Sequence, residues 1–543
     1  MRHRSVVLSC LILLGIWLIV CNGFGAVDAP ETSCEVRTIS NGILLPGDWL
    51  RLAWNGLFGP NRMSIPDCGA LQSGDSEWLS ASIQHVEIPQ HPYMAANRGN
   101  NMHCDSSMSD AYGAPGPVRS DAVVSSRSQG FGGYGTVAFD ARGRIVAVYS
   151  NGRRFQLELM DPYTLEELAS RDLPARPWYW FLTGILPWEY IGAGMYFYLD
   201  DHDRAVVPTT ENTILVLQTP EHGNRFELVR KYDLQDYVAD LPWPRRDSVA
   251  WVLPDWSGEA YWFATTEGIV GTVDVDTAEV HTLRLDGEII ENSFAVDETG
   301  VYILSDYALY RFLRDASGDI VRDWRTPYDR GPRKKPGHIT RGSGTSVSLV
   351  GDANGLVLVT DNAVPQIHLL AIRRDNGDIV CSAPLFEEGK SGTDISTACF
   401  EHADEQGQGT GVYSVLIENN WGHHAFPRSR PVSGLVRIDI RRQDDGTYTS
   451  EQIWESVQKS IGVFKLSLGS GLVYMYWRSE SCPLTTWFLA RVDFATGAVV
   501  GRTKVGTGLG YNNWAGALFL HPDGGTAYAT TIFGLVMVRD PQL

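Results

Sequence analysis

The chain has 543 residues, of which 43% are hydrophobic and 20% are charged, and it contains 17 Trp and 22 Tyr. This supply of apolar and aromatic residues can build a core, which excludes an intrinsically disordered protein, and collagen and coiled-coil repeats are absent. Asp and Glu outnumber Lys and Arg by 64 to 45, giving a net charge of −19. Such an acidic surface repels phosphate backbones, so we expect no nucleic-acid partner.

The first residues have the features of a secretory signal peptide. Met1–Arg4 is basic, an apolar run follows from Val6 to Val20, and small residues around Ala29 supply a cleavage site. The run is shorter than the roughly 20 residues that span a bilayer, and no later stretch is long and apolar enough to do so. We therefore predict a secreted or periplasmic protein with no membrane association after cleavage, and a retained anchor is the minority alternative.

Cleavage near Ala29 leaves an even number of cysteines. They are Cys34, Cys68, Cys104, Cys381, Cys399 and Cys482. In an exported protein this count permits three disulfides with 15 possible connectivities, and inert thiols are the other interpretation. None of the six lies in a CxxC pair, which argues against a zinc cluster or a thioredoxin-type site.

One pattern recurs from about residue 132 to the C-terminus. Each copy has a short apolar strand, a turn rich in Asp and Gly, and further short strands, and the copies begin near residues 135, 194, 248, 294, 346, 394, 462 and 512. Four short strands per unit at this spacing, without helical periodicity, are typical of a β-propeller. We predict an all-β fold with eight blades, and seven blades is the alternative.

The last copy has three strands before the chain ends, so a strand from the N-terminal region should complete its blade. Segment 82–88 alternates suitably and is the candidate closing strand. The predicted organisation is a signal peptide (1–29), an irregular N-terminal cap with the closing strand (30–131), and the propeller (132–543). The face of the propeller that this cap covers stays open.

Propeller topology sorts the polar residues between two faces. Turns such as DARG (140–143), DETG (297–300) and HPDGG (521–525) need Asp, Asn and Gly for their geometry, so we interpret them as structural. The opposite face carries polar residues that turn chemistry does not require, at the leading ends of the inner strands and in the matching loops. They are Tyr134, Asp247, Glu291, Asn292, Ser343, Thr345, Asp394, Asn512 and Asn513, with Glu211, Glu267, Asp306, Asp361, Asn362, Glu418, Asn419 and Asn420.

This polar ring at the axial mouth is the predicted functional site. Carboxylate and amide oxygens suit a hard cation such as Ca²⁺, and the candidate ligands are Glu291, Asn292, Asp361, Glu418, Asn420 and Asn512. Glu291 and Glu418 are also candidates for acid/base catalysis with Lys465 as a cationic partner, and His338 or His103 as a proton carrier or further ligand. The alternative interpretation is a solvated polar rim.

Two further features carry weaker signals. The aromatic cluster Trp178, Tyr179, Trp180, Trp188 and Tyr190 is either a stacking platform for a sugar or aromatic ring or packing between blades. The basic loop 330–344 either attracts an anionic substrate or is a solvated charge run. GxSxG, P-loop and post-strand GxGxxG motifs are absent.

Several strings resemble a family of secreted, largely uncharacterised bacterial β-propeller proteins. They are PDWSG (254–258), ENSFAVDETG (291–300), KPGHITRGSGT (335–345), TDNA (360–363), ENN (418–420), KLSLGSGLVY (465–474) and GTGLGYNN (506–513). The resemblance covers about residues 100–540 and implies the fold and export but no reaction. Turns such as DFATG (493–497) are also similar to quinoprotein and YVTN-type propellers. The regular tryptophan-docking motif of PQQ dehydrogenases is missing, which argues against PQQ.

These observations favour an enzyme that cleaves a small organic substrate at the axial mouth. The reaction is of hydrolase or lyase type, and a divalent cation, calcium first and copper second, assists it by polarising an oxygen. One alternative is a copper- or quinone-dependent periplasmic oxidoreductase, and another is a non-catalytic binding or scaffold propeller, since the fold hosts many functions. Substrate, metal identity and oligomeric state stay open.

Overall fold

The computed structural model describes residues 39, 81–183, 192, 194–336, 338, 340–423, 432, 434–457, 460, 462–479, 485–513 and 516–541. The predicted signal peptide and the residues Cys34, Cys68, Cys482, Trp188 and Tyr190 lie outside this part of the chain. Its helices are the short 3-10 helices η1 (Trp180–Thr183), η2 (Gln235–Tyr237) and η3 (Leu509–Tyr511). Among these residues no helix has the length and hydropathy needed to cross a membrane.

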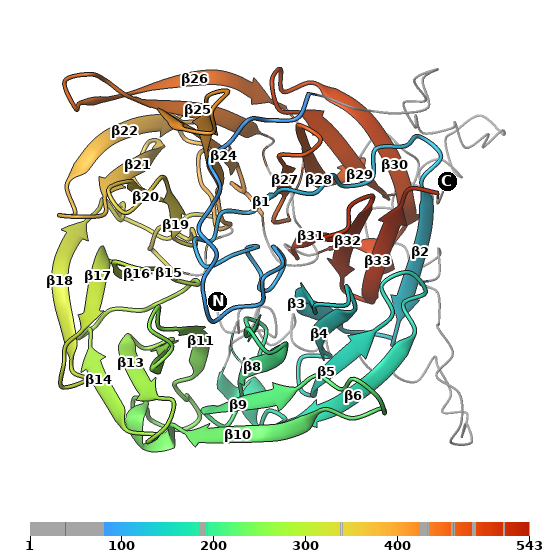
Figure 1. Ribbon diagram of the computed structural model, residues 1–543, viewed down its shortest axis with the longest axis vertical. Coiled ribbons are helices and arrows are strands. Elements are labelled where there is room, and N and C mark those ends of the chain that lie inside the picture. The colour runs from blue at the N-terminus through green and yellow to red at the C-terminus, as the bar shows by residue number, and fades with distance from the viewer. Residues whose placement is uncertain are drawn as a thin grey trace, which may run out of the picture. The chain divides into compact units, whose positions relative to one another are not determined.

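Eight sheets form a ring around a central axis, which confirms the predicted eight-bladed β-propeller (Figure 1). Blades 1 to 4 are β3 (Gly133–Phe139), β4 (Ile145–Ser150), β5 (Phe155–Met160) and β6 (Glu167–Leu173); β7 (Tyr198–Leu199), β8 (Arg204–Pro208), β9 (Thr213–Gln218) and β10 (Glu227–Asp233); β11 (Val249–Pro254), β12 (Ala260–Thr265), β13 (Ile269–Asp274) and β14 (Val280–Arg284); and β15 (Ala295–Asp297), β16 (Gly300–Leu304), β17 (Ala308–Arg314) and β18 (Ile320–Pro327). In each blade the first strand lies nearest the axis.

Blades 5 to 8 repeat the same order with small additions. They are β19 (Ser348–Val350), β20 (Leu356–Thr360), β21 (Ile367–Arg373) and β22 (Ile379–Leu385); β23 (Ala398–Ala403), β24 (Gly409–Glu418), β25 (Leu435–Arg442) and β26 (Tyr448–Ser456); β27 (Lys465–Ser467), β28 (Leu472–Ser479), β29 (Thr486–Asp493) and β30 (Val499–Thr507), with β1 (Ala111–Tyr112) parallel to β27; and β31 (Leu518–Leu520), β32 (Thr526–Thr531), β33 (Gly534–Arg539) and β2 (Val123–Ser128).

The ring is closed by an N-terminal strand, as expected, but the strand is a different one. Strand β2 pairs antiparallel with β33, with Val123 opposite Arg539 and Ser128 opposite Gly534. The predicted segment 82–88 instead makes a single bridge, from His85 to His402 of blade 6. Strand β2 precedes β3 by a short link, so it reaches the neighbouring last blade with little loss of chain entropy, a difference that alternation does not reveal.

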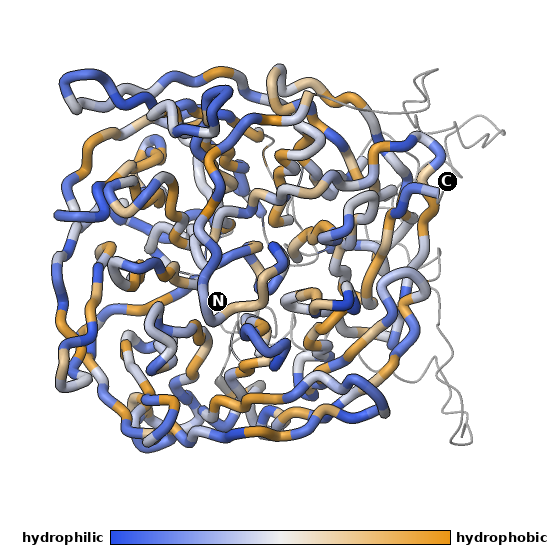
Figure 2. Tube along the Cα trace, viewed as in Figure 1, coloured by the Kyte–Doolittle hydropathy of each residue, from blue (hydrophilic) through white to orange (hydrophobic). Residues whose placement is uncertain are grey.

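The core lies between neighbouring blades and explains the long apolar runs. Trp262 and Phe263 are consecutive in β12 and point to opposite faces of their sheet, yet they are only 2% and 0% exposed. Middle strands are covered on both faces, so they read as continuous hydrophobic segments rather than as alternation. The outermost strand β18 is mostly exposed or half-buried. Figure 2 shows the same contrast between hydrophobic blades and hydrophilic turns.

An irregular N-terminal segment, residues 99–112, winds around the axis, and we call it the axial belt (Figure 1). Its carbonyls accept hydrogen bonds from the inner strands of six blades, from the amides of Phe139, Leu199, Val296, Leu349, Cys399 and Leu466. These amides lie near the turns that follow the inner strands. The belt therefore covers the turn face of the propeller, opposite the predicted mouth.

For the cysteines that the structure describes, the disulfide interpretation is wrong and the thiol interpretation holds. Cys104, Cys381 and Cys399 are free thiols. The Cys104 thiol donates to the Ala111 carbonyl at 3.4 Å, and the Cys399 thiol donates to the Leu349 carbonyl at 3.7 Å. Both are buried and fill core space as small hydrophobes, a role that cysteine counting cannot distinguish from a staple.

Candidate functional site

Two levels of polar side chains follow one another along the axis. In blades 4 and 6 the chain entering the inner strand carries a carboxylate followed two residues later by a serine, as Glu291 and Ser293 and as Asp394 and Ser396. Each inner strand runs from the mouth face to the turn face, so the carboxylates lie nearer the mouth than the serines. We call the carboxylates at this level, together with Glu418, the mouth carboxylates. We call the hydrogen-bonded groups at the level of the serines the inner network.

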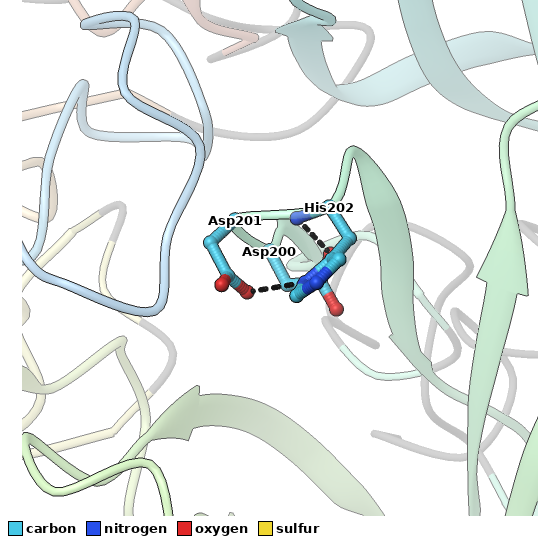
Figure 3. Close-up of side chains that lie close together, drawn as sticks. All are labelled: Asp200, Asp201 and His202. Atoms are coloured by element: carbon cyan, nitrogen blue, oxygen red, sulfur yellow. Dashed lines mark hydrogen bonds and ion pairs between the residues drawn. The ribbon is translucent and has the colours of Figure 1, made fainter.

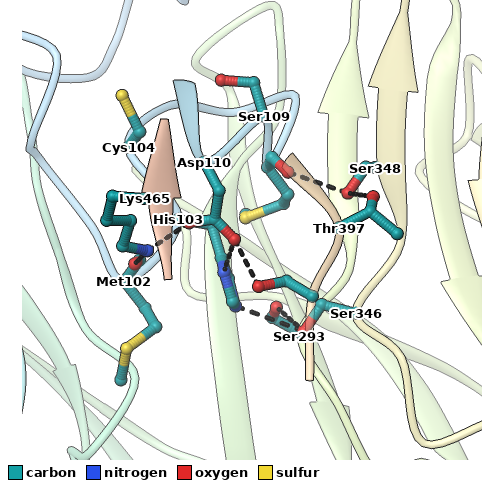
Figure 4. A network of polar contacts seen from close by, with 12 residues as sticks. Met102, His103, Cys104, Ser109, Asp110, Ser293, Ser346, Ser348, Thr397 and Lys465 are labelled. Carbon is teal, nitrogen blue, oxygen red and sulfur yellow. Dashed lines mark hydrogen bonds and ion pairs between the residues drawn. The ribbon is translucent and has the colours of Figure 1, made fainter. Parts of the chain in front are cut away.

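The inner network joins the axial belt to blades 4 to 7 (Figure 4). His103 Nδ1 lies 3.0 Å from Asp110 Oδ2, and His103 Nε2 lies 3.2 Å from Ser346 Oγ. Ser293 Oγ donates to Ser346 Oγ at 3.1 Å. Both ring nitrogens of His103 are therefore engaged in hydrogen bonds, which leaves neither available as a metal ligand.

Lys465 completes the inner network from strand β27. Its ammonium group donates to the Met102 carbonyl at 2.8 Å and forms an ion pair with Asp110. Lys465 and Asp110 are 0% and 1% exposed. Burial alone would raise the pKa of Asp110, but the charges of Lys465 and His103 outweigh it and hold the pKa below the usual value.

The structure thus brings together two predicted catalytic candidates, Lys465 and His103, and adds Asp110, which the sequence interpretation missed. A signal was available in the run Asn100–Asp110, which is polar but has buried side chains such as Asn101 and Asp105. A polar segment that is buried must be hydrogen-bonded throughout, so it marks a network rather than a loose cap.

A small cavity lies beside the inner network. Its lining includes Met108, Tyr196, Trp251 and the polar side chains of His103 and Ser293. The cavity holds about 20 Å³, which is room for about one water molecule. This cavity is therefore too small for an organic substrate.

The mouth carboxylates are Glu291, Asp394 and Glu418. Glu418, at the end of β24, is 1% exposed, and neither of its carboxylate oxygens has a hydrogen-bond partner. Burial raises its pKa well above the usual value, and the neighbouring Asp394 charge adds to the effect. Burial and the charge of Glu291 raise the pKa of Asp394 to about 7. Glu291 accepts a hydrogen bond from Thr340 at 2.5 Å, and burial raises its pKa.

Further buried polar atoms near these carboxylates have no partner. They are Asp394 Oδ1, Asn420 Nδ2, Asn513 Oδ1 and both ring nitrogens of His338. Asn420 Oδ1 is engaged, since it accepts from Thr393 Oγ1 and from the Asp394 amide at 3.1 and 3.2 Å. Burial and the neighbouring Lys335 lower the pKa of His338 to about 3, so its ring is neutral at pH 7.

The other predicted ligands, Asn292, Asp361 and Asn512, lie in other local structures. Asn292 Nδ2 donates to the Gly344 carbonyl at 2.5 Å. Asp361 is 2.8 Å from His368 Nδ1 and accepts from the His368 amide at 2.7 Å. Asn512 ends helix η3. Of the predicted metal ligands, the structure therefore gathers Glu291, Glu418 and Asn420 around Asp394.

A separate acidic group lies in the turn after β7 (Figure 3). Among the described residues, one set of three His, Cys or carboxylate donors lies within 4.8 Å, namely Asp200, Asp201 and His202. Asp200 accepts from the His202 and Arg204 amides at 3.0 and 2.9 Å, and from Arg204 Nε at 2.6 Å. These bonds close the turn, in line with the structural role expected for it.

An exposed aromatic surface lies on loops that join outer strands to the next inner strands, and we call it the aromatic rim. Trp178 and Trp243 are 68% and 69% exposed. The ring of Tyr179 lies between them, with centroid distances of 5.9 Å to each. Trp180 instead packs under the Arg176 guanidinium at 5.3 Å. The expectation of a stacking surface therefore falls on Trp178, Tyr179 and Trp243.

Comparisons with known proteins found structural similarity at low TM-scores only. No protein-family model matches the chain, and no curated protein matches it. The crystal structure of Saccharomyces cerevisiae Sqt1 is similar with a TM-score of 0.39 and 10% identity over 60% of this chain and 76% of that one. The β-propeller domain of Myceliophteria thermophila Cps50 (Swd1) gives 0.33 and 9% over 63% and 94%. The computationally designed Ika8 protein gives 0.39 and 11% over 76% and 96%.

Proposed function

We propose that this chain is a non-catalytic binding propeller. The observation that carries the proposal is the closure of the axis by the axial belt, which leaves space for about one water molecule beside His103. Lys465 and His103 are held by Asp110, Ser346 and backbone groups, so they support the framework. Because the belt closes the turn-face end of the axis, we expect the partner to bind on the outer surface of the ring.

The aromatic rim is the surface that best suits a partner protein. Trp and Tyr dominate the energetics of protein interfaces because they bury a large area with few rotatable bonds. Two neighbouring tryptophans that are about two-thirds exposed are unusual on a surface without a partner. Trp178, Tyr179 and Trp243 would then be anchors in a protein-protein interface.

Quantitative cross-linking with partner identification tests this function. The purified protein is compared with the double variant Trp178→Ala/Trp243→Ala and with the control Val457→Ala, whose side chain is 78% exposed elsewhere. We expect a saturable partner that the control retains and the double variant loses. Turnover of a small molecule by the wild-type protein, without any such partner, would overturn the proposal.

The second candidate is a hydrolase or lyase that acts on a small substrate at the mouth. The observation that favours it is the group of unpartnered carboxylates, because strongly shifted pKa values such as those of Asp394 and Glu418 concentrate at functional sites. Metabolite profiling with wild-type and Glu418→Gln protein tests it. Consumption of one compound by the wild-type protein alone supports this candidate. A copper site would need histidines other than His103, whose nitrogens are engaged.

We further propose export to the periplasm or beyond, in line with the resemblance to secreted bacterial propellers. The support is the basic and apolar leader that precedes Ala29. Intact-mass measurement of the protein from the periplasmic fraction is the test. A mature form that begins near residue 30 is expected, and full-length protein confined to the cytoplasm would contradict it.

A further inference from the structure

The mouth end of the axis has a group of buried oxygen atoms without donors. Both oxygens of Glu418, Oδ1 of Asp394 and Oδ1 of Asn513 lack hydrogen-bond partners. Folded proteins pair nearly all buried polar atoms, so an unpaired group needs a specific explanation such as a bound ion. Leaving a buried acceptor unpaired costs about 1–3 kcal/mol, and more for a charged group.

These side chains belong to blades 6 and 8, and the entrance to blade 7 lies between them. Glu418 and Asp394 both belong to blade 6. The charge of Asp394 raises the pKa of Glu418, and the nearby Ser460 hydroxyl offsets part of the effect of burial. Ser460 Oγ accepts from the Gly462 amide at 3.4 Å at the entrance to blade 7. A Cβ atom at Gly462 would lie 2.1 Å from Asn513 Nδ2, so glycine leaves room for this amide at the entrance to blade 8.

Within the described part of the chain, no compensating positive charge lowers the pKa of Glu418 or Asp394. Among the described residues, no Lys, Arg or His contributes to the electrostatic environment of Glu418 or Asp394, whereas Glu291 adds a further negative charge at Asp394. The basic side chains nearby serve other groups, since Lys335 donates to the Ala363 carbonyl and Arg330 pairs with Asp306. Buried charges without a counterion are strongly unfavourable.

We propose that Glu418, Asp394 and Asn513 bind a hard divalent cation of the Ca²⁺ class at the mouth end of the axis. Carboxylate and amide oxygens without nitrogen or sulfur donors are the ligand set of Ca²⁺, and backbone carbonyls or waters complete its shell. The cation would supply the positive charge and would also coordinate the unpaired oxygens. Of the six ligands predicted from the sequence this site keeps only Glu418, and Asp394 and Asn513 take the place of the other five. It does not depend on the proposed binding function.

Calcium titration of the full chain tests the site directly. Protein treated with EDTA and then freed of chelator is titrated with CaCl₂ by isothermal titration calorimetry and by thermal unfolding. We expect one saturable site and a Tm that rises with calcium, because a ligand that binds the folded state alone stabilises it. Glu418→Gln should weaken the affinity at least tenfold, and the control Asp201→Asn, in the turn after β7, should leave it unchanged.

Several outcomes would overturn the proposal. One is a wild-type protein that shows neither heat nor a Tm change with CaCl₂ or MgCl₂, and another is wild-type affinity in a folded Glu418→Gln variant. If circular dichroism shows that Glu418→Gln does not fold, the variant Asn513→Asp tests the site instead. This variant keeps a side-chain oxygen and adds a negative charge, so its calcium affinity should rise. An unchanged or lower affinity in folded Asn513→Asp contradicts the site.

Discussion

Buried charges along the axis fall into two kinds with opposite energetic consequences. Asp110 is surrounded by Lys465, His103 and the Ser396 hydroxyl, so its charge is compensated. Glu418 is equally buried but has no hydrogen-bond partner. The first arrangement stabilises a framework, and the second stores unfavourable free energy that a ligand or proton must relieve.

Removing Lys465 should therefore destabilise the fold strongly. Lys465→Met leaves the Asp110 carboxylate buried without its main counterion, and breaking such a pair costs about 3–5 kcal/mol of unfolding free energy. Urea unfolding measures the loss. The double variant Lys465→Met/Asp110→Asn should recover much of it, since no uncompensated charge remains. Additive losses in the double variant would contradict a coupled pair.

His338 should make the fold sensitive to acid. Its folded-state pKa of about 3 lies below the unfolded value of about 6.5, so the unfolded chain binds the proton first as pH falls. The unfolding free energy should then fall by about 1.4 kcal/mol per pH unit between about pH 6 and pH 4. Urea titrations at several pH values give the slope of unfolding free energy against pH. The difference in this slope between wild-type protein and His338→Asn is the contribution of His338. Equal slopes would show that His338 is charged or solvated in the folded state.

Residue types alone identified several of these positions. Lys465 and His103 stood out because a lysine in an inner strand and a histidine in a polar run need partners. Asp110 was missed because its role depends on a backbone with φ of 50° that places it across from β27. Asp361 matched the expected chemistry, but its local bonds to His368 have no signature in the sequence.

At the scale of elements, the axial belt has only the two-residue strand β1 as regular secondary structure but makes regular contacts. It supplies one carbonyl to each of six inner strands. Three of its residues, Cys104, Met108 and Asp110, have positive φ without being glycine. Such conformations cost of order 1–3 kcal/mol each and persist where the surroundings impose them. The ring therefore stabilises the conformation of the belt, and the belt in turn stabilises the ring.

Hydrogen exchange should reveal this mutual support. In the wild-type protein the amides of Val296, Leu349 and Leu466 should exchange slowly, because belt carbonyls accept their hydrogen bonds. A variant that lacks residues 81–110 should expose these three amides and exchange them at least tenfold faster. The amide of Val273, in middle strand β13, serves as the internal control and should stay protected. Unchanged exchange at Val296 would show that the belt contributes little.

The elements that the sequence predicted well are those with a period. Inner and middle strands carry apolar runs bounded by Asp-Gly turns, so their positions were predictable. The belt has no period, and its hydrogen bonds join residues more than 30 positions apart, such as Gly99 with Phe139. The alternation of apolar and polar residues in 82–88 indicated an extended segment, but it does not determine which blade the segment contacts.

At the scale of the whole molecule, ring closure turns eight sequential blades into one structure. Repeat arrays contact only their neighbours, so an open array unfolds unit by unit. Pairing of β2 with β33 ties the last blade to the segment that leads into blade 1. The eight-fold repeat was visible in the sequence because every blade needs the same turns, whereas the partner of β33 depended on where the N-terminal chain returns.

Opening the closure should therefore change how the protein unfolds. Wild-type protein is expected to lose tryptophan fluorescence and far-UV circular dichroism in one coincident urea transition, since each blade has two neighbours. Removing residues 534–541 deletes β33 and leaves β2 and β32 without their shared partner. The two probes should then separate, with terminal blades unfolding first and the midpoint lowered. Val229→Asp, a charge on the half-exposed β10, is the control and should keep one transition near the wild-type midpoint. A coincident, unshifted transition in the truncated chain would show that closure through β2 and β33 does not couple the blades.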